Sequence, residues 1–165
     1  MILIAEATVN DLPIIRDIAY RTWPNTYGDI LSMEQVSYML DLFYNEELLL
    51  KNYSEKVHQF LLAREGTESL GFASFEHNYK ELNLTRIHKL YVLPESHGKG
   101  AGKVMMDALE VTAKANHSDS ILLNVNRFNK AVSFYTKVGF EIVGQEDIVL
   151  EHGYLMEDYI MRKRL

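Results

Sequence analysis

The segment from residue 90 to residue 103 constrains the fold of this 165-residue chain more than any other. It is an apolar strand that runs through one proline into a glycine-rich loop, and an apolar helix follows directly. A strand, a glycine loop and a helix start in this order offer backbone N–H groups and the positive end of a helix dipole to one anion. Lys99 and Lys103 add positive charge beside it. Three glycines let the backbone approach the anion without a Cβ in the way: Gly98, Gly100 and Gly102.

Two common nucleotide-binding patterns fail on this loop. Aligned on Gly102, the first glycine of a P-loop falls on His97 and its hydroxyl residue falls on Val104. The dinucleotide fingerprint needs a third glycine where Lys103 stands. The pattern that remains is Gln/Arg-x-x-Gly-x-Gly/Ala after a Val-x-Pro strand end. This loop resembles the acetyl-CoA loop of the GNAT superfamily of N-acetyltransferases, with His97 at the Gln/Arg position, where its contact with a pyrophosphate would depend on pH.

A second segment, residues 126–140, resembles the same superfamily. It reads Asn-Arg-Phe-Asn-Lys-Ala-Val-Ser-Phe-Tyr-Thr-Lys-Val-Gly-Phe and matches the GNAT pattern Asn…Ala…Phe/Leu-Tyr-x-Lys-x-Gly-Phe. The two segments follow each other in the family order, and together they extend the resemblance over roughly residues 84–140. Either Asn126 or Asn129 can take the family's role in contacting coenzyme A, and we favour Asn129.

The resemblance implies an α/β fold of the GNAT type in a single domain, residues 1–165. The expected sheet is mixed, mostly antiparallel and seven-stranded, with a splayed central parallel pair and about four flanking helices. Hydrophobic periodicity, caps and turns predict the elements. Strands are expected at 2–7, 59–64, 69–76, 82–92, 121–125, 140–150 and 154–162, and helices at 11–22, at 32–50 with a break, after the glycine loop, and at 129–138.

The resemblance also implies how acetyl-CoA is bound. The pantetheine arm would pair with the strand near residues 90–92 like an extra strand, where a backbone N–H can polarise the thioester carbonyl. The glycine loop would hold the pyrophosphate. The residues expected to bind the coenzyme are Leu90, Tyr91, Val92, His97, Gly98, Lys99, Gly100, Ala101, Gly102, Lys103, Asn129 and Tyr135.

Direct acetyl transfer to an amine is the expected reaction. The chain has no cysteine, so the acyl group passes directly or through another nucleophile. Tyr135 is the expected proton donor to the leaving thiolate, and Glu76 is the expected general base. The segment around Trp23 and Tyr27 resembles, more loosely, the substrate side of polyamine-type N-acetyltransferases. A small amine or polyamine is therefore favoured as acceptor, and a peptide amine is the second candidate.

Several of these residues also have a purely structural interpretation. Trp23 and Tyr27 can close the core instead of lining an acceptor pocket, and Tyr135 can be a core aromatic. The histidines are scattered without a spacing such as His-x-x-x-His, so no metal site is expected. A GNAT-fold module that binds acyl-CoA without catalysis is the alternative to an enzyme, and the retained Tyr135 favours the enzyme.

The composition of the whole chain narrows its partners. The net charge of −6 argues against a general nucleic-acid binder and weakly suits a cationic substrate. The sequence has no run of eighteen apolar residues, and its first residues do not resemble a signal peptide. We therefore expect a cytoplasmic protein that does not act on membranes. Dimerisation is common among proteins of this fold, so a homodimer is an open expectation.

Overall fold

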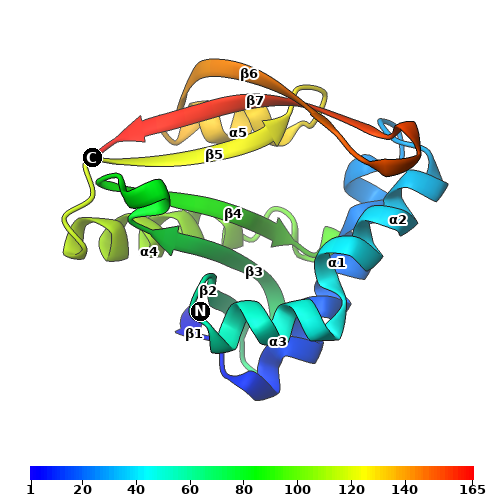
Figure 1. Ribbon diagram of the computed structural model, residues 1–165. Helices are drawn as coiled ribbons and strands as arrows, with labels where there is room; N and C mark the ends of the chain where they lie inside the picture. The colour runs from blue at the N-terminus through cyan, green and yellow to red at the C-terminus, as the bar shows by residue number, and fades with distance from the viewer.

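The computed structural model describes residues 1–165 as one sheet with helices on both faces (Figure 1). The strands are β1 (Ile2–Glu6), β2 (Gln59–Glu65), β3 (Glu68–His77), β4 (Leu84–Val92), β5 (Ser120–Asn126), β6 (Glu141–Val149) and β7 (Leu155–Arg164). The helices are α1 (Leu12–Tyr27), α2 (Met33–Tyr44), α3 (Glu46–Ser54), α4 (Ala101–Ala115) and α5 (Ala131–Lys137). None of them combines the length and the apolar character that crossing a membrane requires.

The seven strands lie in the order β1-β2-β3-β4-β5-β7-β6, and only β4 and β5 run parallel to each other. This confirms the predicted mixed, mostly antiparallel sheet. The parallel pairing covers Leu84–Ile87 of β4 and Ser120–Leu123 of β5, and no pair follows it. The remainder of β4, residues 88–92, therefore has a free edge toward β5, and the two strands diverge there (Figure 1).

Two hydrophobic clusters hold the helices on opposite faces of the sheet. Helices α1, α2 and α3 cover one face, where Trp23, Tyr44 and Phe72 are buried together. Helices α4 and α5 cover the other face, with Met105 and Tyr135 in its cluster. The split between β4 and β5 therefore opens between two separately packed layers.

Strand β4 contains a bulge at His88. Lys89 pairs with Ser74 and Ile87 pairs with Phe75, so one residue of β4 has no partner of its own on β3. Ile87 and Leu90 both pack against the α4 face although they are three positions apart, which a regular two-residue alternation would forbid. The bulge thus gives one face of β4 an additional side chain.

Two predicted helix boundaries are wrong. Helix α1 does not end near Trp23 but continues through Pro24 to Tyr27. Proline removes one N–H from the helix, but the buried rings of Trp23 and Tyr27 anchor the last turn in the core. Helix α5 begins at Ala131 rather than at 129, because the Asn129 side chain accepts the Ala131 N–H at 2.8 Å and forms a turn before the helix. The predicted break within 32–50 lies between α2 and α3.

Candidate active site

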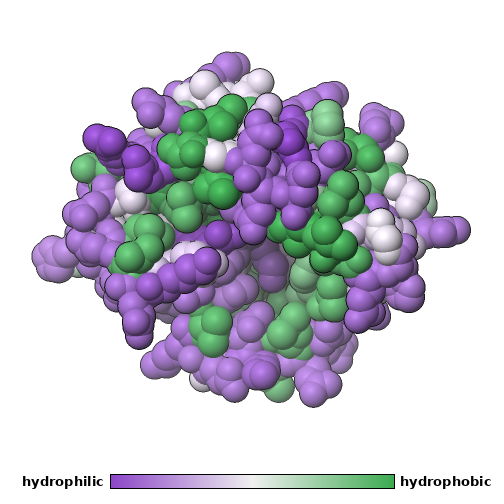
Figure 2. Space-filling model, turned by 45° about the horizontal axis from the view of Figure 1, so that its top comes forward, coloured by the Kyte–Doolittle hydropathy of each residue, from purple (hydrophilic) through white to green (hydrophobic).

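A cavity of about 1060 Å³ follows the split between β4 and β5. Its lining reaches from the glycine loop at the start of α4 to the ends of α1 and α2, so both helical layers contribute. Figure 2 shows a hollow near the middle of the molecular face, bordered by hydrophobic (green) and hydrophilic (purple) residues. Most residues predicted for the coenzyme and acceptor sites line this cavity, including Tyr135, Trp23 and Tyr27.

The glycine loop has the backbone geometry of an anion site. Gly98 and Gly100 have φ of +85° and +84°, a left-handed conformation that side chains with a Cβ disfavour. Gly102 serves a different purpose, because a Cβ there would meet the Phe134 ring at 3.4 Å. The first N–H groups of α4 have no partners within the helix. The loop therefore presents free backbone donors and a helix dipole to the cavity, and these fit a pyrophosphate.

The side chains of this loop are directed elsewhere. The Nε2–H of His97 donates to the Val92 carbonyl at 3.0 Å, which ties the loop to the end of β4. Lys99 pairs with Glu65 at 3.2 Å, and Lys103 pairs with Asp107 on the next turn of α4. Neither lysine lines the cavity. The positive charge expected beside the anion is therefore held in exposed ion pairs, and the backbone supplies the site.

Tyr135 lies in the α5 layer beneath the split. Its ring packs against Phe134 and Phe140, with centroids 5.4 and 5.7 Å away, and only 7% of the residue is exposed. Burial, reinforced by the nearby Tyr27, raises the pKa of the Tyr135 hydroxyl above its usual value. The hydroxyl is therefore kept protonated and can act as a hydrogen-bond donor in the cavity.

Two more tyrosines stand at the acceptor end. The hydroxyls of Tyr27 and Tyr91 lie 3.0 Å apart. Burial raises the pKa of Tyr27 to about 12 and that of Tyr91 well above its usual value. Tyr27 also packs on Trp23, with ring centroids 4.7 Å apart. These aromatic residues both close the core and line the cavity, so Trp23 and Tyr27 remain candidates for the acceptor site.

Both candidate asparagines line the cavity. Asn126 ends β5, is 3% exposed and accepts the Phe128 N–H at 2.9 Å. Asn129 accepts the Ala131 N–H and so shapes the entry to α5. Each side-chain carbonyl is therefore used in a turn, and the Asn126 amide group donates to the Met156 sulfur at 3.8 Å.

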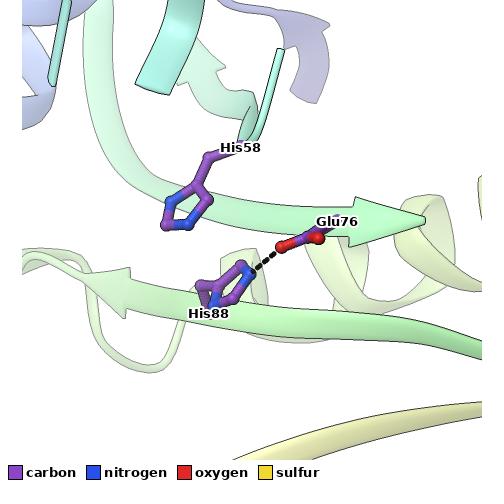
Figure 3. A group of neighbouring side chains, drawn as sticks. All are labelled: His58, Glu76 and His88. Atoms are coloured by element: carbon purple, nitrogen blue, oxygen red, sulfur yellow. Dashed lines mark hydrogen bonds and ion pairs between the residues drawn. The ribbon is translucent and has the colours of Figure 1, made fainter. Parts of the chain in front are cut away.

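Glu76, the expected general base, does not line the cavity. Its Oε1 lies 2.9 Å from Nε2 of His88, the bulge residue, as Figure 3 shows. The His88 ring stacks on His58, which precedes β2, with centroids 4.0 Å apart and planes 12° apart. Burial lowers the pKa of both histidines to about 3, aided for His58 by its neighbour His88. Glu76 therefore acts on the cavity only through a neutral imidazole.

These three residues also bring potential metal ligands together, with ligand atoms all within 4.8 Å of one another. Sequence spacing missed this group because its members come from three different segments. The near-parallel rings direct their lone pairs along separate planes rather than toward one point. Arg86 and Lys89 also lie close enough for their charges to lower the pKa of His88. Parallel rings and nearby cations both disfavour a divalent cation.

A carboxylate that sequence reasoning missed, Asp158, lies on the far side of the split. It belongs to β7, pairs with Asn126 in register, lines the cavity and is 6% exposed. Its Oδ2 accepts from Asn124 at 3.2 Å, whereas its Oδ1 is buried without a partner. Burial raises the pKa of this carboxyl. The only signal in the sequence that could have indicated Asp158 is an acidic residue within a strand whose other residues are partly apolar.

Two cations of β4 also line the cavity. The Lys89 ammonium lies over the Tyr44 ring, 4.6 Å from its centroid, and burial lowers the Lys89 pKa to about 8. The Arg86 guanidinium lies over Tyr79 at 4.9 Å, and its Nε is buried without a hydrogen-bond partner. Neither residue forms an ion pair, even though Glu76 pairs with Arg86 in the sheet register.

The chain is similar to known acetyltransferases along most of its length. The family model described as acetyltransferase (GNAT) domain matches residues 30–163. An uncharacterized N-acetyltransferase of Mycobacterium tuberculosis is 26% identical over 95% of this chain and 99% of its own length. Spermidine N(1)-acetyltransferase of Thermoplasma acidophilum is 28% identical over 92% of this chain and 96% of its own. The crystal structure of the PaiA N-acetyltransferase from that organism, in complex with coenzyme A, matches 100% of this chain and 99% of that one with a TM-score of 0.82 and 25% identity.

Proposed function

Since this chain belongs to the acetyltransferase (GNAT) family and is an N-acetyltransferase, we propose that it moves an acetyl group from acetyl-CoA directly to the primary amine of a small molecule. One observation carries the proposal: a single cavity connects the glycine loop, Tyr135 and the Asp158 carboxylate, whose Oδ1 has no partner. An anion cradle, a proton donor and a group that attracts an ammonium are the parts that this reaction needs.

The coenzyme half of the cavity fits acetyl-CoA. The left-handed Gly98 and Gly100 and the start of α4 would receive the pyrophosphate. The edge of β4 beyond Ile87 has no partner from β5, so it can pair with an extended pantetheine arm. The thioester supplies the acetyl group, and the leaving sulfur departs as a thiolate. Tyr135, held protonated by burial, is the group that would donate to that sulfur.

The acceptor must lose its ammonium proton before it attacks. We assign this role to Asp158 in place of Glu76, because Asp158 lines the cavity and its Oδ1 has no partner, whereas Glu76 hydrogen bonds His88 outside the lining. The buried carboxylate attracts the ammonium, and its raised pKa makes it a better proton acceptor than an exposed aspartate. The first proton lost by nitrogen then resides on Asp158, and the sulfur gains its proton from Tyr135. The second proton, which nitrogen loses as the tetrahedral intermediate collapses to the amide, restores the Tyr135 hydroxyl.

The acceptor class is a small amine, with polyamines as the first candidates that the sequence resemblance raises and peptide amines as the second. The relative that is named a spermidine N(1)-acetyltransferase gives polyamines further support. We also propose a cytoplasmic protein, on the basis of its acidic, cysteine-free composition. We also propose a homodimer, because dimers are common among proteins of this fold.

Thiol release from acetyl-CoA tests the function. Purified protein incubated with acetyl-CoA and a panel of polyamines, amino acids, simple amines and peptide N-termini should release free thiol with at least one acceptor. Mass spectrometry should then find the acetyl group on the amine nitrogen. Tight coenzyme A binding without thiol release for any acceptor would instead favour the non-catalytic acyl-CoA-binding module.

A further inference from the structure

We infer that the acceptor carries an anionic oxygen group, a carboxylate or a phosphate, which Lys89 and Arg86 bind while Asp158 receives its ammonium. This inference rests on the proposed function and specifies its substrate class. This acceptor differs from the polyamine expected from the sequence. A polyamine carries a second positive charge, whereas the acceptor inferred here carries a negative charge.

The first observation is the absence of carboxylate partners for the two cations of β4. Lys89 and Arg86 line the cavity, where each charge lies over an aromatic ring, Tyr44 for Lys89 and Tyr79 for Arg86, and forms no ion pair. Glu76 is the carboxylate closest to them in the sheet register, and it is engaged by His88 and lies outside the cavity lining. A ring face compensates a desolvated cation only in part, so both cations remain available to an anion.

The second observation is the bulge, which places an uncharged side chain beside the two cations. His88 is the additional residue of β4, and it stacks on His58 where both line the cavity. Burial holds both imidazoles neutral, and the single N–H of His88 is donated to the Glu76 carboxylate. The bulge residue therefore engages Glu76 and leaves Lys89 and Arg86 available to an oxygen anion.

The third observation is the opposite charge across the split. Asp158 has an unpartnered, buried Oδ1, and Glu146 accepts from the same Asn124 side chain. Asp29, exposed just beyond α1, also lines the cavity. The charge of Arg86 lowers the pKa of Asp158, although the two groups do not form an ion pair. A molecule with an ammonium at one end and an anion at the other matches both walls.

A polyamine fits this arrangement less well. Its amine under attack would be attracted to Asp158, but its next ammonium would meet Lys89 and Arg86 in a largely desolvated space. Like charges in such surroundings repel more strongly than in water. The two walls therefore select against a second positive charge on the acceptor.

The test compares three acceptors of equal chain length: γ-aminobutyrate, butylamine and putrescine. They differ only in a terminal group that is negative, neutral or positive. Because one charged hydrogen bond changes affinity by roughly tenfold to a hundredfold, we expect kcat/KM in the thiol-release assay to favour γ-aminobutyrate over putrescine by at least about tenfold. Aminopropyl phosphate and the α-amino acids extend the series, and they distinguish a phosphate from a carboxylate and a distant from an adjacent anion.

Lys89→Met tests the residue, because it removes the charge and keeps the length of the side chain. It should lower kcat/KM for the preferred anionic acceptor by about tenfold or more and change the value for butylamine by less than about threefold. Lys114→Met, on the exposed side of α4, is the matched control and should change neither value. An equal loss for all acceptors would assign Lys89 a structural role and overturn the inference.

The remaining outcomes separate the two proposals. Preference for putrescine or spermidine, or equal use of all three acceptors, would overturn the anionic acceptor and leave the acetyltransferase function intact. If none of the amines causes thiol release, the proposed function is contradicted instead. In that case, calorimetry of γ-aminobutyrate and putrescine with the coenzyme A complex decides the inference, which requires that the first bind more tightly.

Discussion

The two walls of the cavity are built from different parts of the chain. The wall that we propose for the coenzyme, the coenzyme wall, is mainly backbone and consists of the glycine loop, the first turn of α4 and the free edge of β4. The wall that we propose for the acceptor, the acceptor wall, consists of side chains from three segments of the chain: His58, Arg86, His88, Lys89 and Asp158. A wall made of backbone can keep binding the same coenzyme after many side chains have been substituted. A wall made of side chains can change its acceptor specificity after a single substitution.

The two walls also differ in whether their charged side chains are exposed and paired or buried. The charged side chains of the coenzyme wall, Lys99 and Lys103, are exposed and paired with carboxylates. In the acceptor wall, burial raises the pKa of Asp158 and lowers that of Lys89, so both groups are ionised against the preference of their surroundings. Such states oppose folding, which favours a functional over a structural role for the acceptor wall.

The largest effect should come from one atom of the acceptor wall. Asp158→Asn keeps the shape of the side chain but removes the proton acceptor, so kcat/KM should fall by about 10²–10⁴-fold while coenzyme A affinity stays unchanged. Glu76→Gln should lower kcat/KM by less than about tenfold, because Glu76 acts only through His88. Steady-state kinetics and calorimetry of the two variants check this. The reverse order of the two losses would return the role of base to Glu76.

The next largest effect is expected from Tyr135, which we place between the two walls. Tyr135→Phe removes the hydroxyl that would protonate the leaving sulfur and should lower kcat by on the order of 10²-fold. The ring packing against Phe134 and Phe140 is retained, so the thermal midpoint should change little. Single-turnover measurements separate the acetyl-transfer step from product release. Wild-type turnover in this variant would remove Tyr135 from the mechanism.

Acid should destabilise the protein through the acceptor wall. His58 and His88 have pKa values of about 3 in the folded protein, below the ordinary 6.5, so the unfolded chain binds more protons. Their contribution to stability is complete above pH 6.5 and is lost as the pH falls toward 3. We expect the free energy of unfolding to drop by about 2–4 kcal/mol over this window.

Urea denaturation at several pH values measures this dependence. Replacing both histidines with glutamine should flatten it, because glutamine does not titrate. His97→Gln, which alters an exposed imidazole of the coenzyme wall, should leave the dependence as it is in the wild type. An unchanged slope in the double variant would show that other groups cause the acid sensitivity.

A smaller effect is expected from the backbone of the coenzyme wall. Gly100→Ala introduces no clash, since no atom lies within 4 Å of the new Cβ, but it strains a residue with φ of +84°. A left-handed alanine costs about 1–2 kcal/mol, so coenzyme A affinity should fall by about tenfold. Gly66→Ala has the same kind of strain in the β2–β3 turn and should lower stability without changing coenzyme A affinity. Equal coenzyme A affinity in both variants would contradict a backbone-built site.

The smallest effect should come from the exposed lysines. Lys99→Met and Lys103→Met each remove one exposed ion pair, and such pairs contribute little. Coenzyme A affinity should change by less than about threefold at physiological salt. A larger, salt-dependent loss would mean that these lysines leave their carboxylate partners to bind the coenzyme, and the coenzyme wall would then depend on side chains too.

The difference between the walls also explains what the sequence could predict. The glycine loop and the helix with Tyr135 are continuous segments, so their residue patterns carried the family resemblance. That resemblance implied the sheet type, the splayed pair and the residues expected to bind the coenzyme. Lys89 and Asp158 were not predicted as site residues because each is a single charged residue in a strand. Whether such a residue reaches the cavity depends on the face of the sheet on which its side chain lies. The bulge at His88 fixes that face for β4, and nothing in the local residue pattern predicted the bulge.

The continuation of α1 past Pro24 illustrates the same limit. Proline predicts a helix end from local chemistry alone, whereas the buried rings of Trp23 and Tyr27 are tertiary contacts. Helix α5 was likewise predicted to start too early, because Asn129 closes a turn with its side chain. Local signals located the elements, and contacts between distant residues determined where these two helices begin and end.

The bulge has a consequence for how such a protein can change over time. Arg86 pairs with Glu76 and Lys89 with Ser74 on either side of it, so His88 is an insertion of one residue between two otherwise regular stretches of β4. A single codon, gained or lost at this position, would add or remove one residue of the acceptor wall while every other pair of β3 and β4 keeps its register. Related enzymes could therefore diverge in acceptor by length changes within a strand, which alignments of such chains would record as one-residue gaps.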